Sequence, residues 1–345
     1  MLPTTGEGFV ATSRNSSIEL LRIFAIFGIV TMHINGELMS SAQGSTAAWI
    51  QLENSLFNAG VSVFVLISGY YGIRRTWHKA AVLEITAIVY SALTALLSSM
   101  QGGGTSLKVV LQAFIPISTN QYWFLSCYML LMLFAPYIND AVQCLRKDDL
   151  KRLILLMVAV FYVLPTVIYY HVLGTGKNAI NMLTLYLLGS YLRKYASDED
   201  VSNKALVATY ASSTFAILLL NCAASAVTGS VHIPFARDCS IFVLLQAVSL
   251  FIMFKRYNFA SVSVNGVSRH VLAAYLFEGA FRASVLPLII DVGMYQGSEM
   301  WPALSILISL LTISACVLID VPIQRVVALV VDVLQFLVNR VLRAD

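Results

Sequence analysis

Charged residues are scarce in this chain. Lys, Arg, Asp and Glu make up 12% of the 345 residues, whereas a soluble domain carries about a quarter. Hydrophobic residues make up 58%, and the mean hydropathy is +0.78. This composition excludes an ordinary soluble domain and predicts a polytopic integral membrane protein with little mass outside the bilayer.

Patterns typical of metal and nucleic-acid binding are also missing. The five cysteines are scattered without a CxxC spacing, and the chain shows no metal-ligand spacing. The net charge of +4 comes from basic residues spread among loops, without a basic stripe interleaved with aromatics. The sequence therefore predicts no metal site and no nucleic-acid partner.

Long apolar runs separated by polar breaks predict an all-α helix bundle, with about ten transmembrane helices in the lipid bilayer. We expect one membrane-embedded domain over 1–345, without an appended soluble domain. We expect the last span to end at Pro322, and the amphipathic tail 324–345 either extends that helix or lies on the membrane surface. The predicted spans are 18–38, 56–73, 80–100, 121–139, 153–172, 179–194, 205–226, 239–255, 270–290 and 301–322.

The connections between these spans are alternately rich and poor in basic residues. The poorer set carries only Lys108, Lys177 and Arg237. By the positive-inside rule, the richer connections are cytoplasmic. Basic residues near both termini join the richer set, so both termini are predicted to be cytoplasmic, in a multi-pass protein of the cytoplasmic membrane.

The first apolar run carries a stripe of ionisable residues. Arg22 and His33 are eleven residues apart, which is about three helical turns, so their side chains share one face roughly 16 Å apart along the axis. Glu19 and Glu37 fall on the same face. Because ionisable groups are costly at membrane depth, the stripe indicates either a functional site or a polar clamp to a neighbouring helix.

Each member of the stripe suits a particular role. His33 suits a general base, because imidazole titrates near neutral pH. Glu37, one turn further on, is placed to hold the His33 tautomer or to stabilise the imidazolium. Arg22 suits an anionic group such as phosphate, and Glu19 is spaced for an i, i+3 ion pair with it.

Four short segments follow one another in a defined order along the chain. They are 15–22 followed by His33, 60–70, 122–125 and 275–277. Together they resemble the acyltransferase-3 family, membrane acyltransferases that modify sugars of bacterial surface and secreted molecules. The resemblance implies a helical membrane bundle, a cytoplasmic acyl-CoA donor and an acceptor hydroxyl at the outer face. It makes His33 the catalytic histidine and Arg22 the family's arginine.

The chain departs from the family pattern at two places. Glu278 stands where the family's late motif often continues with His. Arg74 and Arg75 are adjacent, whereas members often carry two arginines spaced three apart. Arg74 and Arg75, with Arg22 and Glu19, are the candidates for binding the coenzyme, although the adjacent arginines also satisfy the positive-inside rule.

Aromatic and charged residues of later spans are candidates for acceptor binding. Tyr122 and Trp123 are placed either to anchor the helix at the membrane interface or to stack against a sugar. Glu278 and Arg282 are spaced for an i, i+4 ion pair or for lining an acceptor cleft, with Tyr275 nearby on the same span.

These observations predict a glycan O-acetyltransferase. It transfers an acyl group, expected to be acetyl from acetyl-CoA, to a hydroxyl of an extracytoplasmic or lipid-linked sugar or of an exopolysaccharide, with His33 as the base. The alternative is a transporter or flippase of a small or lipid-linked anion, in which the stripe forms a translocation path or proton relay. The sequence is compatible with a monomer and with a homo-oligomer.

Overall fold

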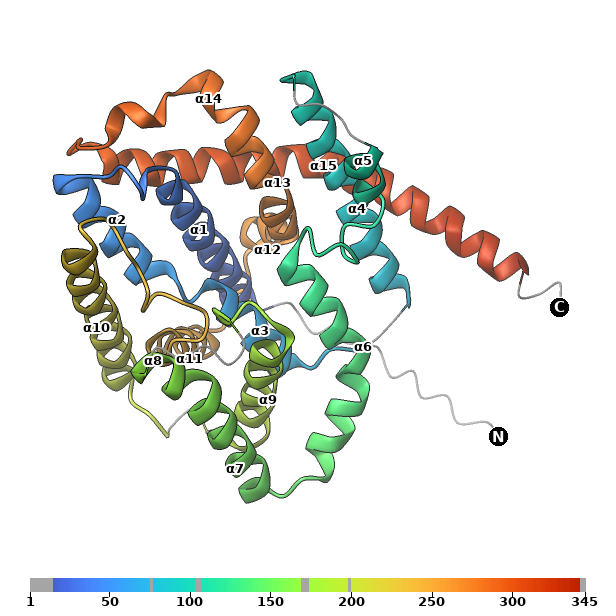
Figure 1. Ribbon diagram of the computed structural model, residues 1–345. Coiled ribbons are helices and arrows are strands. Elements are labelled where there is room, and N and C mark those ends of the chain that lie inside the picture. The colour runs from blue at the N-terminus through green and yellow to red at the C-terminus, as the bar shows by residue number, and fades with distance from the viewer. Residues whose placement is uncertain (1–14, 75–76, 103–106, 169–173, 198–199, 342–345) are drawn as a thin grey trace.

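A computed structural model describes residues 15–74, 77–102, 107–168, 174–197 and 200–341. Throughout these residues the regular structure is helical (Figure 1). The elements are α1 (Ser16–Leu38), α2 (Gly44–Phe57), α3 (Gly60–Tyr71), α4 (Trp77–Met100), α5 (Leu107–Ala113), α6 (Trp123–Cys144), α7 (Lys147–Val158), η1 (Ala159–Val163), α8 (Leu164–Val167), α9 (Ala179–Tyr195), α10 (Asn203–Thr228), α11 (Ile241–Lys255), α12 (Val262–Ser268), α13 (Val271–Ser284), α14 (Leu286–Ile289), η2 (Val292–Tyr295) and α15 (Trp301–Val341).

Seven helical segments of the described chain are long and apolar enough to cross a membrane, so the protein is a multi-pass membrane protein. They are α1, α2 with α3, α4, α6, the run from α7 to α8, α10 and α15. The predicted spans 179–194, 239–255 and 270–290 are also helical, but their helices are shorter than the seven segments above. They correspond to α9 with 17 residues, α11 with 15, and α13 and α14 with 14 and 4. Ten crossings and cytoplasmic termini stay predictions.

Pro287 interrupts the helix of the ninth predicted span, whereas Pro322 does not interrupt the helix of the tenth. α13 ends at Ser284, and Pro287 lies in the first turn of the short α14, where its missing N–H costs no hydrogen bond. By contrast, Pro322 lies inside α15, which continues to Val341. The prediction that the last span ends at Pro322 is therefore wrong, and the tail extends the helix.

Contacts around Asp320 hold α15 to its neighbours near Pro322. Membrane helices tolerate an internal proline where neighbouring groups hold the surrounding turn. Tyr90 of α4 donates a hydrogen bond to one Asp320 carboxylate oxygen at 2.7 Å, and Gln324 donates to the same oxygen at 3.0 Å. His270 Nδ1 lies 2.7 Å from the other oxygen. Asp320 thus ties α15 to α4 and to the start of α13.

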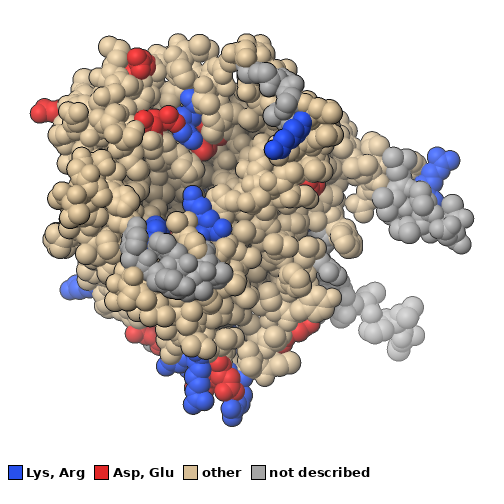
Figure 2. All heavy atoms as spheres, in the orientation of Figure 1, with Lys and Arg blue, Asp and Glu red and all other residues tan. Residues whose placement is uncertain are grey.

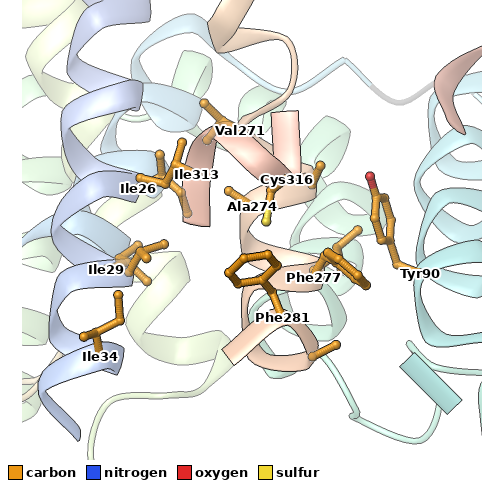
Figure 3. Close-up of a cluster of buried hydrophobic side chains, with 14 of the residues drawn as sticks. Ile26, Ile29, Ile34, Tyr90, Val271, Ala274, Phe277, Phe281, Ile313 and Cys316 are labelled. Atoms are coloured by element: carbon orange, nitrogen blue, oxygen red, sulfur yellow. The ribbon is translucent and has the colours of Figure 1, made fainter. Parts of the chain in front are cut away.

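α1 lies within the bundle, with α4 and α6 to one side and α2 and α10 to the other (Figure 1). It packs against α2, α3, α11, α12, α13 and α15. Its apolar face joins a buried cluster with α4, α13 and α15, which includes Ile26, Tyr90, Phe277 and Ile313 (Figure 3). Two members of the cluster, Ile26 and Ile29, also line the cavity that Arg22 and His33 line.

α3 and α9 pack closely through glycine. A Cβ atom at Gly69 would lie 2.3 Å from the carbonyl oxygen of Tyr186, and a Cβ atom at Gly189 would lie 2.5 Å from that of Leu66. Small residues of this kind let membrane helices approach backbone to backbone. The contact fixes α3, which forms one wall of the functional site.

A buried polar cluster holds the half of α1 that carries His33. Asn35 donates a hydrogen bond from its amide to Glu53 of α2 at 2.8 Å, and Trp301 donates its indole N–H to the Asn35 oxygen at 2.9 Å. Ser305 of α15 donates to Glu53 at 2.9 Å. Because each bond joins different helices, the cluster fixes α1 against α2 and α15.

Candidate active site

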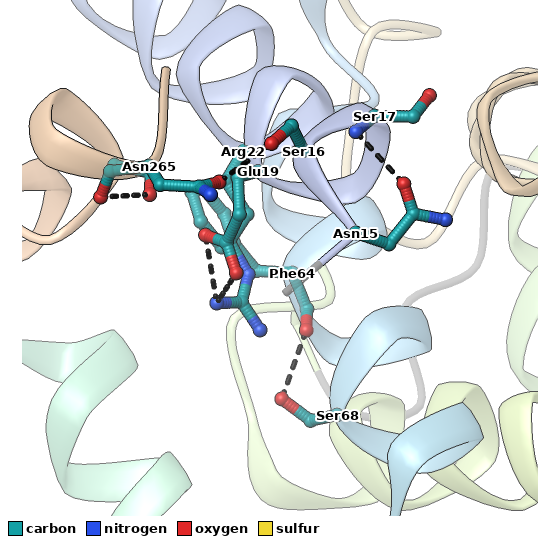
Figure 4. Close-up of polar contacts among 9 residues, drawn as sticks. Asn15, Ser16, Ser17, Glu19, Arg22, Phe64, Ser68 and Asn265 are labelled. Atoms are coloured by element: carbon teal, nitrogen blue, oxygen red, sulfur yellow. Dashed lines mark hydrogen bonds and ion pairs between the residues drawn. The ribbon is translucent and has the colours of Figure 1, made fainter. Parts of the chain in front are cut away.

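The first turn of α1 is tied to the segment around α12. The Asn15 side chain caps the helix by accepting a hydrogen bond from the Ser17 backbone N–H at 2.9 Å. The Ser16 hydroxyl donates to the Asn265 side chain of α12 at 2.9 Å (Figure 4). These contacts set the position of Arg22, which lies two turns along, relative to α12.

Arg22 and Glu19 form the ion pair that their spacing predicts. Arg22 Nη1 lies 3.3 Å from each carboxylate oxygen of Glu19 (Figure 4). The Glu19 side chain is largely buried, whereas 35% of the Arg22 side chain is exposed. The guanidinium therefore keeps donors available to a second anion.

At the other end of the stripe, His33 contacts a buried carboxylate of α13. His33 Nδ1 lies 2.8 Å from Glu278 Oε1. The imidazole is 41% exposed and the Glu278 side chain is 8% exposed. An ionised carboxylate accepts only, so a hydrogen bond from Nδ1–H to an ionised Glu278 leaves the Nε2 lone pair able to take up a proton.

Arg282 extends this pair into a network of four residues. Its Nε lies 3.4 Å from the other Glu278 oxygen, as the i, i+4 spacing predicts, and its Nη1 forms a close ion pair with Glu37. Glu37 was expected to orient His33. In the structure that carboxylate is Glu278, because α13 packs against α1 and brings Glu278 to the level of the imidazole.

A single cavity of about 850 Å³ connects the two ends of the stripe. Arg22 lines it at one end, and His33 and Glu37 line it at the other. Its volume lies in the range of sites that enclose small ligands and cofactors. The molecular surface is hollowed on this face, with Lys and Arg side chains at the rim of the hollow (Figure 2).

The other predicted site residues separate into three groups. Trp123 and Tyr275 line the cavity. Tyr122 is buried beside them, with its ring centroid 6.1 Å from that of Tyr275, and is absent from the lining. Arg74 is exposed and also absent from the lining, whereas Arg75 lies outside the described residues.

Four charged residues of the cavity lining were not predicted as site residues. Arg269, at the corner between α12 and α13, lines the cavity. Lys177, Arg237 and Asp238 line it from the connections that precede α9 and α11. The sequence did carry a signal for two of them. Lys177 and Arg237 are two of the three basic residues in the connections that are otherwise poor in basic residues.

The fold and the site define a multi-pass helical membrane protein with a histidine–carboxylate pair and several arginines around one cavity. A family model described as an acyltransferase domain matches residues 15–321, so the chain belongs to the acyltransferase-3 family, as the four ordered segments predict. Membership implies an enzyme that uses an acyl donor and an acceptor. The chain matches no curated protein and no solved structure.

Proposed function

We propose that the protein transfers an acyl group, acetyl in its simplest form, from acyl-CoA in the cytoplasm to a hydroxyl of an extracytoplasmic or lipid-linked sugar. The supporting observation is the cavity lined by both Arg22 and His33. These residues lie about three turns apart on one helix, so one cavity spans much of the length of α1. A reaction whose substrates arrive from opposite sides of a membrane requires such a passage.

His33 acts as the general base in this proposal. Nδ1–H donates to Glu278, and Nε2 takes the proton of the acceptor hydroxyl as its oxygen attacks the thioester carbonyl. The new C–O bond forms, the C–S bond breaks, and the coenzyme A thiolate takes the proton from the imidazolium. Glu278 stabilises the imidazolium during the step. Transfer through an acyl-imidazole would use the same nitrogen, and trapping that species distinguishes the two routes.

Two arginines serve the donor end of the cavity. Arg22 keeps part of its guanidinium exposed beside Glu19. Arg269 also lines the cavity, and α12 packs against α1, so both arginines lie toward the same end of the cavity. No described residue forms an ion pair with Arg269. Two guanidinium groups suit the phosphates of coenzyme A.

The test uses His33→Ala in protein reconstituted into nanodiscs. Labelled acetyl-CoA is the donor, and cell-envelope glycan deacetylated by mild base is the acceptor. The variant should lose transfer, while His232→Ala, a histidine in an exposed loop outside the cavity lining, should retain it. Full transfer by a correctly inserted His33→Ala protein would refute the catalytic assignment. Movement of substrate without an acetylated product would favour a transporter.

A further inference from the structure

A buried carboxylate lines the cavity from outside the membrane-spanning helices. Asp238 lies in the connection between α10 and α11 and is 8% exposed. Its backbone oxygen accepts a hydrogen bond from Asn181, but its carboxylate accepts none from any residue that the structure describes. The carboxylate oxygens are not among the fully buried, unpaired atoms of the described residues, so they are open to the cavity and available to a ligand.

Close contact between two connections fixes Asp238 in place. Gly176 has φ +94°, and a Cβ atom there would lie 2.5 Å from the backbone nitrogen of Cys239 and 2.8 Å from the carbonyl carbon of Asp238. Only glycine allows this approach and this backbone conformation. Asn181, in the first turn of α9, holds the same peptide through the hydrogen bond to the Asp238 oxygen at 3.4 Å. The carboxylate is therefore held in the cavity wall.

Asp238 shares the cavity with a basic residue, Lys177, and with the proposed catalytic histidine, His33. Burial raises the pKa of Asp238 to about 6, and the charges of Lys177 and His33 act in the opposite direction. Asp238 and His33 both line the cavity. Lys177 Nζ lies 5.7 Å from the centroid of the Trp123 ring, and Lys177, Trp123 and Asp238 all line the cavity.

We propose that Asp238 binds hydroxyl groups of the acceptor sugar that neighbour the hydroxyl activated by His33. This inference rests on the proposed function. A carboxylate accepts several hydrogen bonds and suits a pair of adjacent hydroxyls, and an occupied site would supply the partners that Asp238 lacks. Trp123, in the same cavity, offers a flat apolar surface to the C–H face of the ring. Asp238 thereby positions a polyhydroxylated ring so that one chosen hydroxyl reaches Nε2.

The experiment compares wild type with Asp238→Asn, Asp291→Asn and His33→Ala in nanodiscs, with labelled acetyl-CoA and deacetylated envelope glycan. Asp291 is the matched control, because it is exposed, lies outside the cavity lining and caps η2, a role that Asn also fills. For Asp238→Asn, the acceptor KM should rise by about tenfold or more, since the lost bonds involve a charged acceptor. The KM for acetyl-CoA should stay within about twofold of wild type.

A second measurement needs no substitution. In wild-type protein, carbodiimide modification of Asp238, followed by mass spectrometry and normalised to Asp291, should slow when glycan is added. Acetyl-CoA alone should leave the rate unchanged. Absence of protection by glycan would overturn the inference.

The kinetic outcomes separate the two proposals. If the acceptor KM of Asp238→Asn stays within about twofold of wild type while His33→Ala is inactive, the Asp238 inference is wrong and the proposed function stands. If donor KM rises as much as acceptor KM, Asp238 is structural and the inference is again wrong. If wild type transfers no acetyl group to the glycan, both proposals fail.

Discussion

His33 Nδ1 on α1 lies 2.8 Å from Glu278 Oε1 on α13, although 245 positions separate the two residues in the chain. The contact predicts that Glu278→Gln lowers kcat on the order of 100-fold with little change in either KM. The amide keeps the shape of the side chain but loses the negative charge that stabilises the imidazolium, and outer partners of this kind are typically worth 10- to 100-fold. Release of coenzyme A, followed with a thiol reagent, measures kcat.

Glu299→Gln is the control for this substitution. Glu299 is exposed and lies outside the cavity lining, and its substitution makes the same chemical change. It should retain wild-type kinetics. A Glu278→Gln protein with wild-type kcat would show that His33 works without its carboxylate partner.

The second prediction concerns the donor end of the cavity. Arg269→Ala should raise the KM for acetyl-CoA by about tenfold, because a charge-assisted contact to phosphate is worth about 1.5–3 kcal/mol. Acetyl-pantetheine, which lacks the phosphates of coenzyme A, should show almost no difference between variant and wild type. Arg152→Ala provides the control, since Arg152 is exposed on α7 and absent from the cavity lining. Equal losses with both donors would contradict phosphate binding by Arg269.

The sequence predicts those parts of the site that lie within one helix. The periodicity of an α-helix alone places Arg22 and His33 on one face, and it gives the ion pairs of Arg22 with Glu19 and of Arg282 with Glu278. Each relationship depends on a separation of eleven residues or fewer. No knowledge of helix packing was needed for any of them.

Contacts between distant segments could not be predicted in this way. Glu37 is one helical turn from His33 and was the visible candidate partner, whereas Glu278 reaches the imidazole only because α13 packs against α1. Asp238 lies in a connection, where no periodicity indicates the direction of a side chain. Pro322 likewise gave the wrong end for the last helix, because the residues that hold α15 to its neighbours at this point, Tyr90 and His270, come from distant parts of the chain.

The close packing of α3 on α9 gives a prediction about stability. Gly69→Ala should lower the unfolding midpoint in detergent by several degrees or prevent folding, because its Cβ atom would lie 2.3 Å from a backbone oxygen, which cannot move aside as a side chain does. Gly266→Ala is the matched control, since a Cβ atom there would meet nothing within 4 Å. The control should be neutral or slightly stabilising, as Ala favours helix over Gly. Equal midpoints for both variants would contradict the close packing.

Burial of Asp238 predicts a dependence of stability on pH. Its pKa of about 6 in the folded protein exceeds the ordinary value of 3.8, so the folded state holds the proton more tightly than the unfolded state. Asp238 therefore stabilises the fold fully below about pH 4, and this contribution, about 3 kcal/mol, is lost as the pH rises through about 6. Lys177, Arg237 and His33 line the same cavity as Asp238, so the informative quantity is the difference in stability between wild type and Asp238→Asn at each pH. Thermal unfolding in detergent between pH 4.5 and 8 should show the variant gaining stability relative to wild type as the pH rises. A constant difference across this range would mean that Asp238 is not buried as the structure places it.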